Sequence, residues 1–82
     1  MIKLNKQVEA LEAVQEKIEE RIEQLEERIS TIEEKAYERE SGENTEKELE
    51  KIEELNDEIE DLRSEYDEIQ NALDYLYEYT EY

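Results

Sequence analysis

The chain has 82 residues and carries 28 acidic but only 10 basic side chains, so its formal net charge is −18 with histidine absent. This length bounds the fold to one small domain, and the absence of Cys and His removes disulfides, thiol chemistry, zinc sites built on these residues and the usual general base. No apolar stretch approaches the length that spans a bilayer, and the negative charge opposes direct binding to nucleic acid or to anionic lipid.

The first predicted element is a helix over about residues 3–40. A composition with 46% charged and 35% hydrophobic residues also occurs in disordered chains, but those show no hydrophobic periodicity. Here apolar residues recur at alternating spacings of three and four, as in the heptad repeat of a coiled coil, whose a and d positions form the buried seam. The d positions are Leu4, Leu11, Ile18, Leu25 and Ile32, and the a positions are Val8, Gln15, Ile22, Ile29 and Ala36. Gln15 is the one polar residue in this seam, which is typical of a side chain that specifies register.

A turn is predicted over residues 41–45. The heptad registers on its two sides differ by two residues, so one continuous coiled coil would lose its seam here. Gly42, the only glycine, can adopt the left-handed conformation that ends a helix. Thr45 followed by Glu48 has the pattern of a capping box that starts a new helix. We therefore expect the chain to fold back on itself.

The second predicted helix covers about residues 46–79. Its a positions are Ile52, Ile59, Tyr66 and Leu73, and its d positions are Leu55, Leu62, Ile69 and Leu76. In an antiparallel pair, a residues of one helix face d residues of the other. Pairing residues whose numbers sum to 84, such as Leu25 with Ile59, fills every layer. The sequence therefore predicts an all-α fold, a single two-helix antiparallel coiled-coil hairpin over residues 1–82.

Charged residues beside the seam favour the same orientation. Three pairs of opposite charge are predicted across it: Arg21 with Glu65, Arg28 with Glu58, and Glu19 with Arg63. Each exposed pair contributes about 0.2–1 kcal/mol. Because a two-helix seam buries little apolar surface, we also expect two hairpins to dimerise into a four-helix assembly.

Tyrosines gather near the end of the second helix. Tyr75, Tyr77 and Tyr79 lie in an acidic setting, and Val14 and Ala72 widen the apolar surface at this end of the predicted hairpin. Three interpretations are open: a broadened end of the core, a binding surface in which Tyr supplies the main contacts, or a short strand that uses the alternation of the tyrosines. The binding surface would also be the contact of a homodimer.

The acidic residues are concentrated in the second half of the chain. Residues 41–82 hold 16 acids and three bases, whereas residues 1–40 hold 12 acids and seven bases. A net charge of −18 exceeds the magnitude of about 2–8 that serves the solubility of a small domain. Carboxylates three or four residues apart on a helix lie about 5–6 Å apart, which approaches the spacing of phosphates along a nucleic acid strand. The candidate partner-binding residues are Asp57, Glu60, Asp61, Asp67, Glu68, Asp74, Tyr75, Tyr77 and Tyr79.

In size, charge and helical character the chain resembles small acidic inhibitors made by phages and mobile elements, including DNA-mimic and anti-CRISPR proteins. The resemblance implies a protein that occupies the basic nucleic-acid-binding surface of a partner protein. The alternative is a structural or adaptor coiled coil that self-associates through its Tyr-rich end, with charge serving solubility only.

Catalysis is not expected, because two helices enclose no pocket that could separate the pKa values of paired carboxylates. No cofactor or metal ion is expected either, since the turn lacks the alternating Asp and Asn ligands of an EF-hand. The first residues lack the continuous apolar block of a signal peptide, so a cytoplasmic protein that contacts neither membrane nor nucleic acid directly is predicted.

Overall fold

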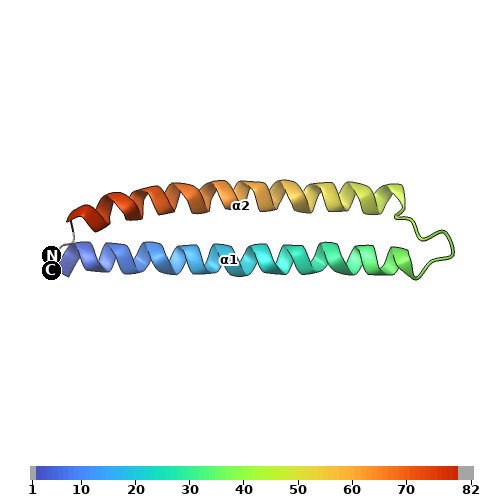
Figure 1. The fold of residues 1–82 in the computed structure, drawn as a ribbon, viewed down its shortest axis with the longest axis horizontal. Coiled ribbons are helices and arrows are strands. Elements are labelled where there is room, and N and C mark those ends of the chain that lie inside the picture. Colours follow the sequence, from blue (N-terminus) through green and yellow to red (C-terminus); the bar gives the residue numbers. More distant parts are fainter. Residues whose placement is uncertain (1, 80–82) are drawn as a thin grey trace.

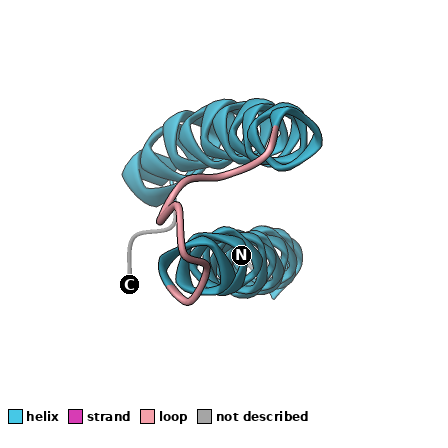
Figure 2. Ribbon diagram, turned by 90° about the vertical axis from the view of Figure 1, so that its right-hand side faces the viewer, coloured by secondary structure: helices cyan, strands magenta, loops and turns pink. Residues whose placement is uncertain are grey.

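The structure, a computed structural model, describes the backbone of residues 2–79 and the side chains of residues 6–78. Two long helices, α1 (Ile2–Tyr37) and α2 (Glu46–Tyr79), run antiparallel and form a rod whose Cα extents are 61 × 16 × 13 Å (Figure 1). Seen from the loop end, the two helices lie against each other and the loop bridges them (Figure 2). The predicted all-α hairpin is confirmed, and the strand considered for Tyr75, Tyr77 and Tyr79 is wrong because these residues are helical.

The buried residues of the rod are those of the predicted seam. Leu25 of α1 is 0% exposed and forms the centre of the core with Leu55 and Ile59 of α2. Around this centre pack four half-buried residues: Ile22, Ile29, Ile32 and Leu62. The core therefore contains the layers that the heptads pair, Leu25 with Ile59 among them. Over the described residues, neither helix combines the length and the apolar character that crossing a bilayer requires.

A polar layer interrupts this seam on the side away from the loop. Gln15 is only 8% exposed, and its Nε2 donates to Oε1 of Gln70 at 2.9 Å. Gln70 in turn donates to the carboxylate of Asp74 at 3.0 Å. Gln15 thus finds its partner beside the expected Ile69 layer, because the long amide of Gln70 reaches into the seam from the neighbouring e position. A buried amide that is hydrogen-bonded only in this pairing favours one register.

The end of α1 differs from the prediction. The helix stops at Tyr37, whereas a helix to residue 40 was expected. Arg39 N–H donates to the carbonyl of Ala36 at 3.1 Å, a tighter turn that closes the helix. Glu34, Glu38 and Glu40 lie just before and after this end, where negative charge is unfavourable for the helix dipole, and Lys35 in the last turn offsets only part of it.

Gly42 shapes the loop rather than the helix end. Its φ is +66°, the left-handed conformation expected of it, but it lies five residues beyond Tyr37. Its N–H donates to the carbonyl of Arg39 at 3.0 Å, so the glycine completes a turn within the loop. The Ser41 hydroxyl accepts a hydrogen bond from the N–H of Glu43 at 3.3 Å and supports the same turn.

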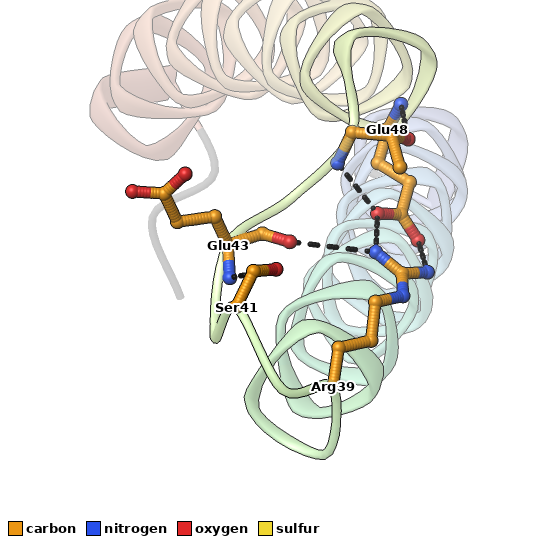
Figure 3. Close-up of polar contacts among 5 residues, drawn as sticks. Arg39, Ser41, Glu43 and Glu48 are labelled. Atoms are coloured by element: carbon orange, nitrogen blue, oxygen red, sulfur yellow. Dashed lines mark hydrogen bonds and ion pairs between the residues drawn. The ribbon is translucent and has the colours of Figure 1, made fainter.

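The start of α2 carries the predicted capping box together with an ion pair that the heptads did not predict (Figure 3). Glu48 N–H donates to the Thr45 hydroxyl at 3.2 Å, and Thr45 N–H donates to the Glu48 carboxylate at 2.9 Å. The same carboxylate accepts hydrogen bonds from both terminal nitrogens of Arg39, and the distance from Arg39 Nη2 to Glu48 Oε2 is 2.6 Å. Arg39 also reaches the carbonyl of Glu43, so this fork joins the end of α1 to the first turn of α2.

The Arg39–Glu48 ion pair gives the hairpin a defined pH dependence. The hydrogen bonds from Arg39, followed by that from the Thr45 backbone, lower the pKa of Glu48 from 4.5 to about 2. A carboxyl whose folded pKa is depressed stabilises the fold fully above its unfolded pKa, and the contribution is lost as pH falls through the folded value. We expect the melting temperature of Glu48→Gln to lie below wild type at pH 6, with the gap closing between pH 4.5 and pH 2. Glu50→Gln, which removes an exposed acid nearby, is the control and should show no such closure; a gap constant with pH would contradict the assignment.

Two ion pairs across the seam differ from the predicted ones. Arg21 donates to the Glu58 carboxylate at 3.1 Å, and Arg63 donates to Glu26 at 3.5 Å. For these two arginines the heptads favour Glu65 and Glu19, which lie seven residues from the acids actually bound. Acids seven residues apart lie on the same side of a helix about 10 Å apart, and a flexible Arg can reach either. The charge pattern therefore predicts the orientation of the helices but not the individual partners.

Candidate protein-binding surface

All six carboxylates proposed for partner binding lie on the exposed side of α2. They are Asp57, Glu60, Asp61, Asp67, Glu68 and Asp74. At 100° per residue they spread over about 140° of the helix circumference, so no single flat partner can contact all of them at once. Glu60, Asp67 and Asp74 recur every seven residues and form one row along the helix.

The row of Glu60, Asp67 and Asp74 lies on the side where α1 also presents carboxylates. A shallow groove of about 510 Å³ is lined by Glu26 of α1 with Glu60 and Arg63 of α2. A second groove on the same side, of about 330 Å³, is lined by Glu19 of α1 with Arg63 and Asp67 of α2. We name this side the acidic face; its groove-lining carboxylates are Glu9, Glu12, Glu16, Glu19, Glu26, Glu60 and Asp67.

The α1 half of the acidic face is absent from the predicted site. A third groove, of about 420 Å³, is lined by Glu9, Glu12, Glu16 and Glu19 together with Tyr66 of α2. The signal was present in the sequence, because the e positions of the first helix hold Glu at every heptad from residue 12 to residue 33. Two antiparallel helices thus border one face with two rows of carboxylates.

The tyrosines do not form one cluster. Tyr77 is 40% exposed, and its hydroxyl donates to the Glu12 carboxylate at 2.9 Å, which places it on the acidic face. Tyr75, 62% exposed, lies two residues earlier and therefore about 200° away around the helix. Tyr79 belongs to α2, but its side chain lies outside the described residues. The predicted Tyr-rich contact accordingly divides between two sides of the hairpin.

Tyr66 is the aromatic residue in the middle of the acidic face. It is half-buried, and a hydrogen bond to Glu19, followed by desolvation and the negative charges of Glu19 and Asp67, raises the pKa of its hydroxyl above the usual value. Tyr66 and Tyr77 therefore each hold a glutamate of α1, and both place an apolar ring beside the carboxylate rows.

This arrangement suits recognition of cationic groups over a long surface. Open grooves flanked by carboxylates attract Lys and Arg side chains and accept their hydrogen bonds. Within residues 6–78, no group of three or more acidic side chains is arranged to hold a metal ion. Comparison with known protein families, with curated protein sequences and with solved structures finds no match to this chain.

Proposed function

We propose that the chain is a non-catalytic protein-binding module, an acidic inhibitor of the phage or mobile-element type that acts in the cytoplasm. Its carboxylates would occupy the basic surface with which a partner protein binds nucleic acid. The observation that carries this proposal is the acidic face, where both helices of a 61 Å rod present rows of carboxylates on one side.

The dimensions of the hairpin support mimicry of a duplex. Two packed helices are about 20 Å across, and their axes lie about 8–10 Å apart. Glu12, Glu19 and Glu26 recur every seven residues on α1, as Glu60, Asp67 and Asp74 do on α2, which gives steps of about 10.5 Å in two antiparallel rows. A partner whose Lys and Arg side chains straddle two phosphate strands would meet two lines of negative charge here.

The aromatic residues of the acidic face would supply selectivity for one partner, which charge alone does not give. A uniform row of carboxylates attracts any basic protein, and electrostatic attraction mainly raises the association rate. Tyr66 and Tyr77 add ring surface beside the rows, and Tyr is enriched among the residues that dominate binding energy. Selectivity for one partner would come from these rings.

Displacement of nucleic acid is the test of the proposal. The immobilised hairpin captures its partner, mass spectrometry identifies it, and the hairpin is then titrated into a complex of that partner with fluorescently labelled nucleic acid. We expect complete displacement, with a competition curve that moves to higher hairpin concentration as salt increases. A partner that binds hairpin and nucleic acid together without mutual loss of affinity would contradict mimicry and support the adaptor alternative.

A further inference from the structure

The side of the hairpin opposite the acidic face has a different charge pattern. A groove of about 480 Å³ there is lined by the basic residues Arg21, Arg28 and Lys51, with Glu27 as its one acidic lining residue. The e and g positions flank the seam on opposite sides, and Arg21 and Arg28 occupy g positions of α1. We name this side the mixed face.

On the mixed face, α1 and α2 carry opposite charges except in the part of α2 nearest the loop, where its c and g positions hold Lys47 and Lys51. The g and c positions of α1 from residue 7 to residue 35 include no acid, and the bases among them are Lys17, Arg21, Arg28 and Lys35. The g and c positions of α2 from residue 54 to residue 68 are all acidic: Glu54, Glu58, Asp61, Glu65 and Glu68. The hydrogen bond from Arg21 to Glu58 shows that the two strips lie side by side.

The mixed face also carries exposed apolar side chains at the end away from the loop. Val14 is 44% exposed and occupies a g position of α1, while Tyr75, 62% exposed, occupies a c position of α2. Ala10 and Ala72 lie at neighbouring c and g positions and are exposed as well. One face thus combines a basic strip, an acidic strip and an apolar end.

We propose that the mixed face binds a second copy of the same chain. The acidic face cannot do so, because two copies would bring carboxylates against carboxylates. The mixed face is self-complementary, because the basic strip of each copy can lie on the acidic strip of the other. This inference does not depend on the proposed function, since the acidic faces of both copies remain on the outside. Of the predicted partner-binding residues, Asp61, Glu68 and Tyr75 lie on the mixed face and would be covered in the dimer.

Symmetry selects one orientation. Two identical faces are related by a two-fold axis in the plane between them, either across the helices or along them. An axis across the helices stacks α1 on α1 and brings base against base. An axis along the helices stacks α1 on α2 of the second copy, with both loops at one end, and only this arrangement pairs opposite charges.

The register of this dimer follows from the hairpin itself. With the axis along the helices, each residue of α1 lies opposite a residue of α2 in the second copy, and the two residue numbers sum to 84. Lys17 then lies near Glu65 and Glu68 of the second copy, and Val14 lies near its Ala72. A face 61 Å long and about 20 Å wide offers roughly 1,000 Å² per copy, which is enough for a stable interface.

A charge exchange tests the proposal. The first variant carries K17E, R21E and R28E, and the second carries E58K, D61K and E65K. In each variant alone both strips of the mixed face have the same sign, so we expect a monomer by sedimentation velocity at 100 µM protein and 150 mM salt. An equimolar mixture restores both complementary contacts and should form a heterodimer at least tenfold tighter than either variant with itself.

Controls separate this interface from unspecific effects of charge. The variant E16K, E20K and E23K makes three reversals away from the mixed face and should dimerise like wild type, and circular dichroism should show unchanged helicity in all variants. Monomeric wild type under these conditions, or a mixture no more associated than its components, would overturn the proposal.

Crosslinking tests the orientation. Ser41→Cys in the loop should form a disulfide-linked dimer readily, because the axis along the helices brings both loops together. Mixing Ser41→Cys with Gln7→Cys is the control, since these positions meet only when the axis lies across the helices. Preferential 41–7 crosslinking would overturn the stacking of α1 on α2.

Discussion

Replacing Leu25 by Ala should unfold most of the hairpin at 25 °C. Leu25 is 0% exposed and contacts the two other buried residues of the central cluster, Leu55 and Ile59. A buried Leu→Ala change costs about 2–5 kcal/mol through lost burial and the cavity that it leaves. A core of this size rarely supplies more than about 3–5 kcal/mol, so the substitution removes most of the net stability. Helicity by circular dichroism against temperature measures the effect.

Leu49→Ala is the matched control for this prediction. It makes the same chemical change on α2 at a side chain that is 53% exposed, so its effect should stay within about 0.5 kcal/mol. Equal shifts in melting temperature for the two variants would show that Leu25 does not lie in the core.

Neutralising the outer surface of α2 should weaken binding to a basic partner at least a hundredfold at low salt. The variant replaces four exposed carboxylates that lie outside the mixed face by their amides: Asp57→Asn, Glu60→Gln, Asp67→Asn and Asp74→Asn. None of them belongs to the hydrophobic seam, so the helicity should be unchanged. The association rate should fall most and its salt dependence should flatten, because the long-range field supplies the attraction. Surface plasmon resonance at several salt concentrations measures the association rate and the dissociation rate separately.

A second set of four neutralisations distinguishes this surface from net charge. Exposed acids outside the acidic and mixed faces, in α1 and in the loop after it, serve for it: Glu20, Glu34, Glu38 and Glu40, each changed to Gln. Both variants have the same net charge, yet only the α2 variant should lose most of its affinity. Equal losses would mean that the partner senses total charge rather than the α2 carboxylates.

The helical part of the fold was predictable because its determinants are local. Apolar residues at alternating spacings of three and four form one apolar side on each helix, whatever that side packs against. The capping box of Thr45 and Glu48 involves residues three apart and can be predicted in the same way. The boundary of α1 at Tyr37 was missed, because helix ends depend on small differences between alternative turns.

The candidate site was predictable only in part. Exposure of the six α2 carboxylates follows from their positions outside the seam, and the structure confirms it. The α1 carboxylates of the acidic face and the separation of Tyr75 from Tyr77 could have been inferred from helical geometry. The bonds of Tyr77 to Glu12 and of Gln70 to Gln15 depend on how side chains of two helices meet, which a heptad pattern does not describe.

By itself, the sequence determined two helices, their antiparallel pairing and the layers of their core. Burial of apolar side chains dominates folding, and only this pairing places apolar residues opposite one another in nearly every layer. The tertiary structure alone decided which charged side chains meet: Arg21 with Glu58, Arg63 with Glu26, and Arg39 with the half-buried Glu48. The first two pairs are exposed and contribute about 0–1 kcal/mol each, so two acids have nearly equal free energy as partners of each arginine. The choice among them depends on side-chain rotamers and on the path of the loop, and these exist only in the folded hairpin.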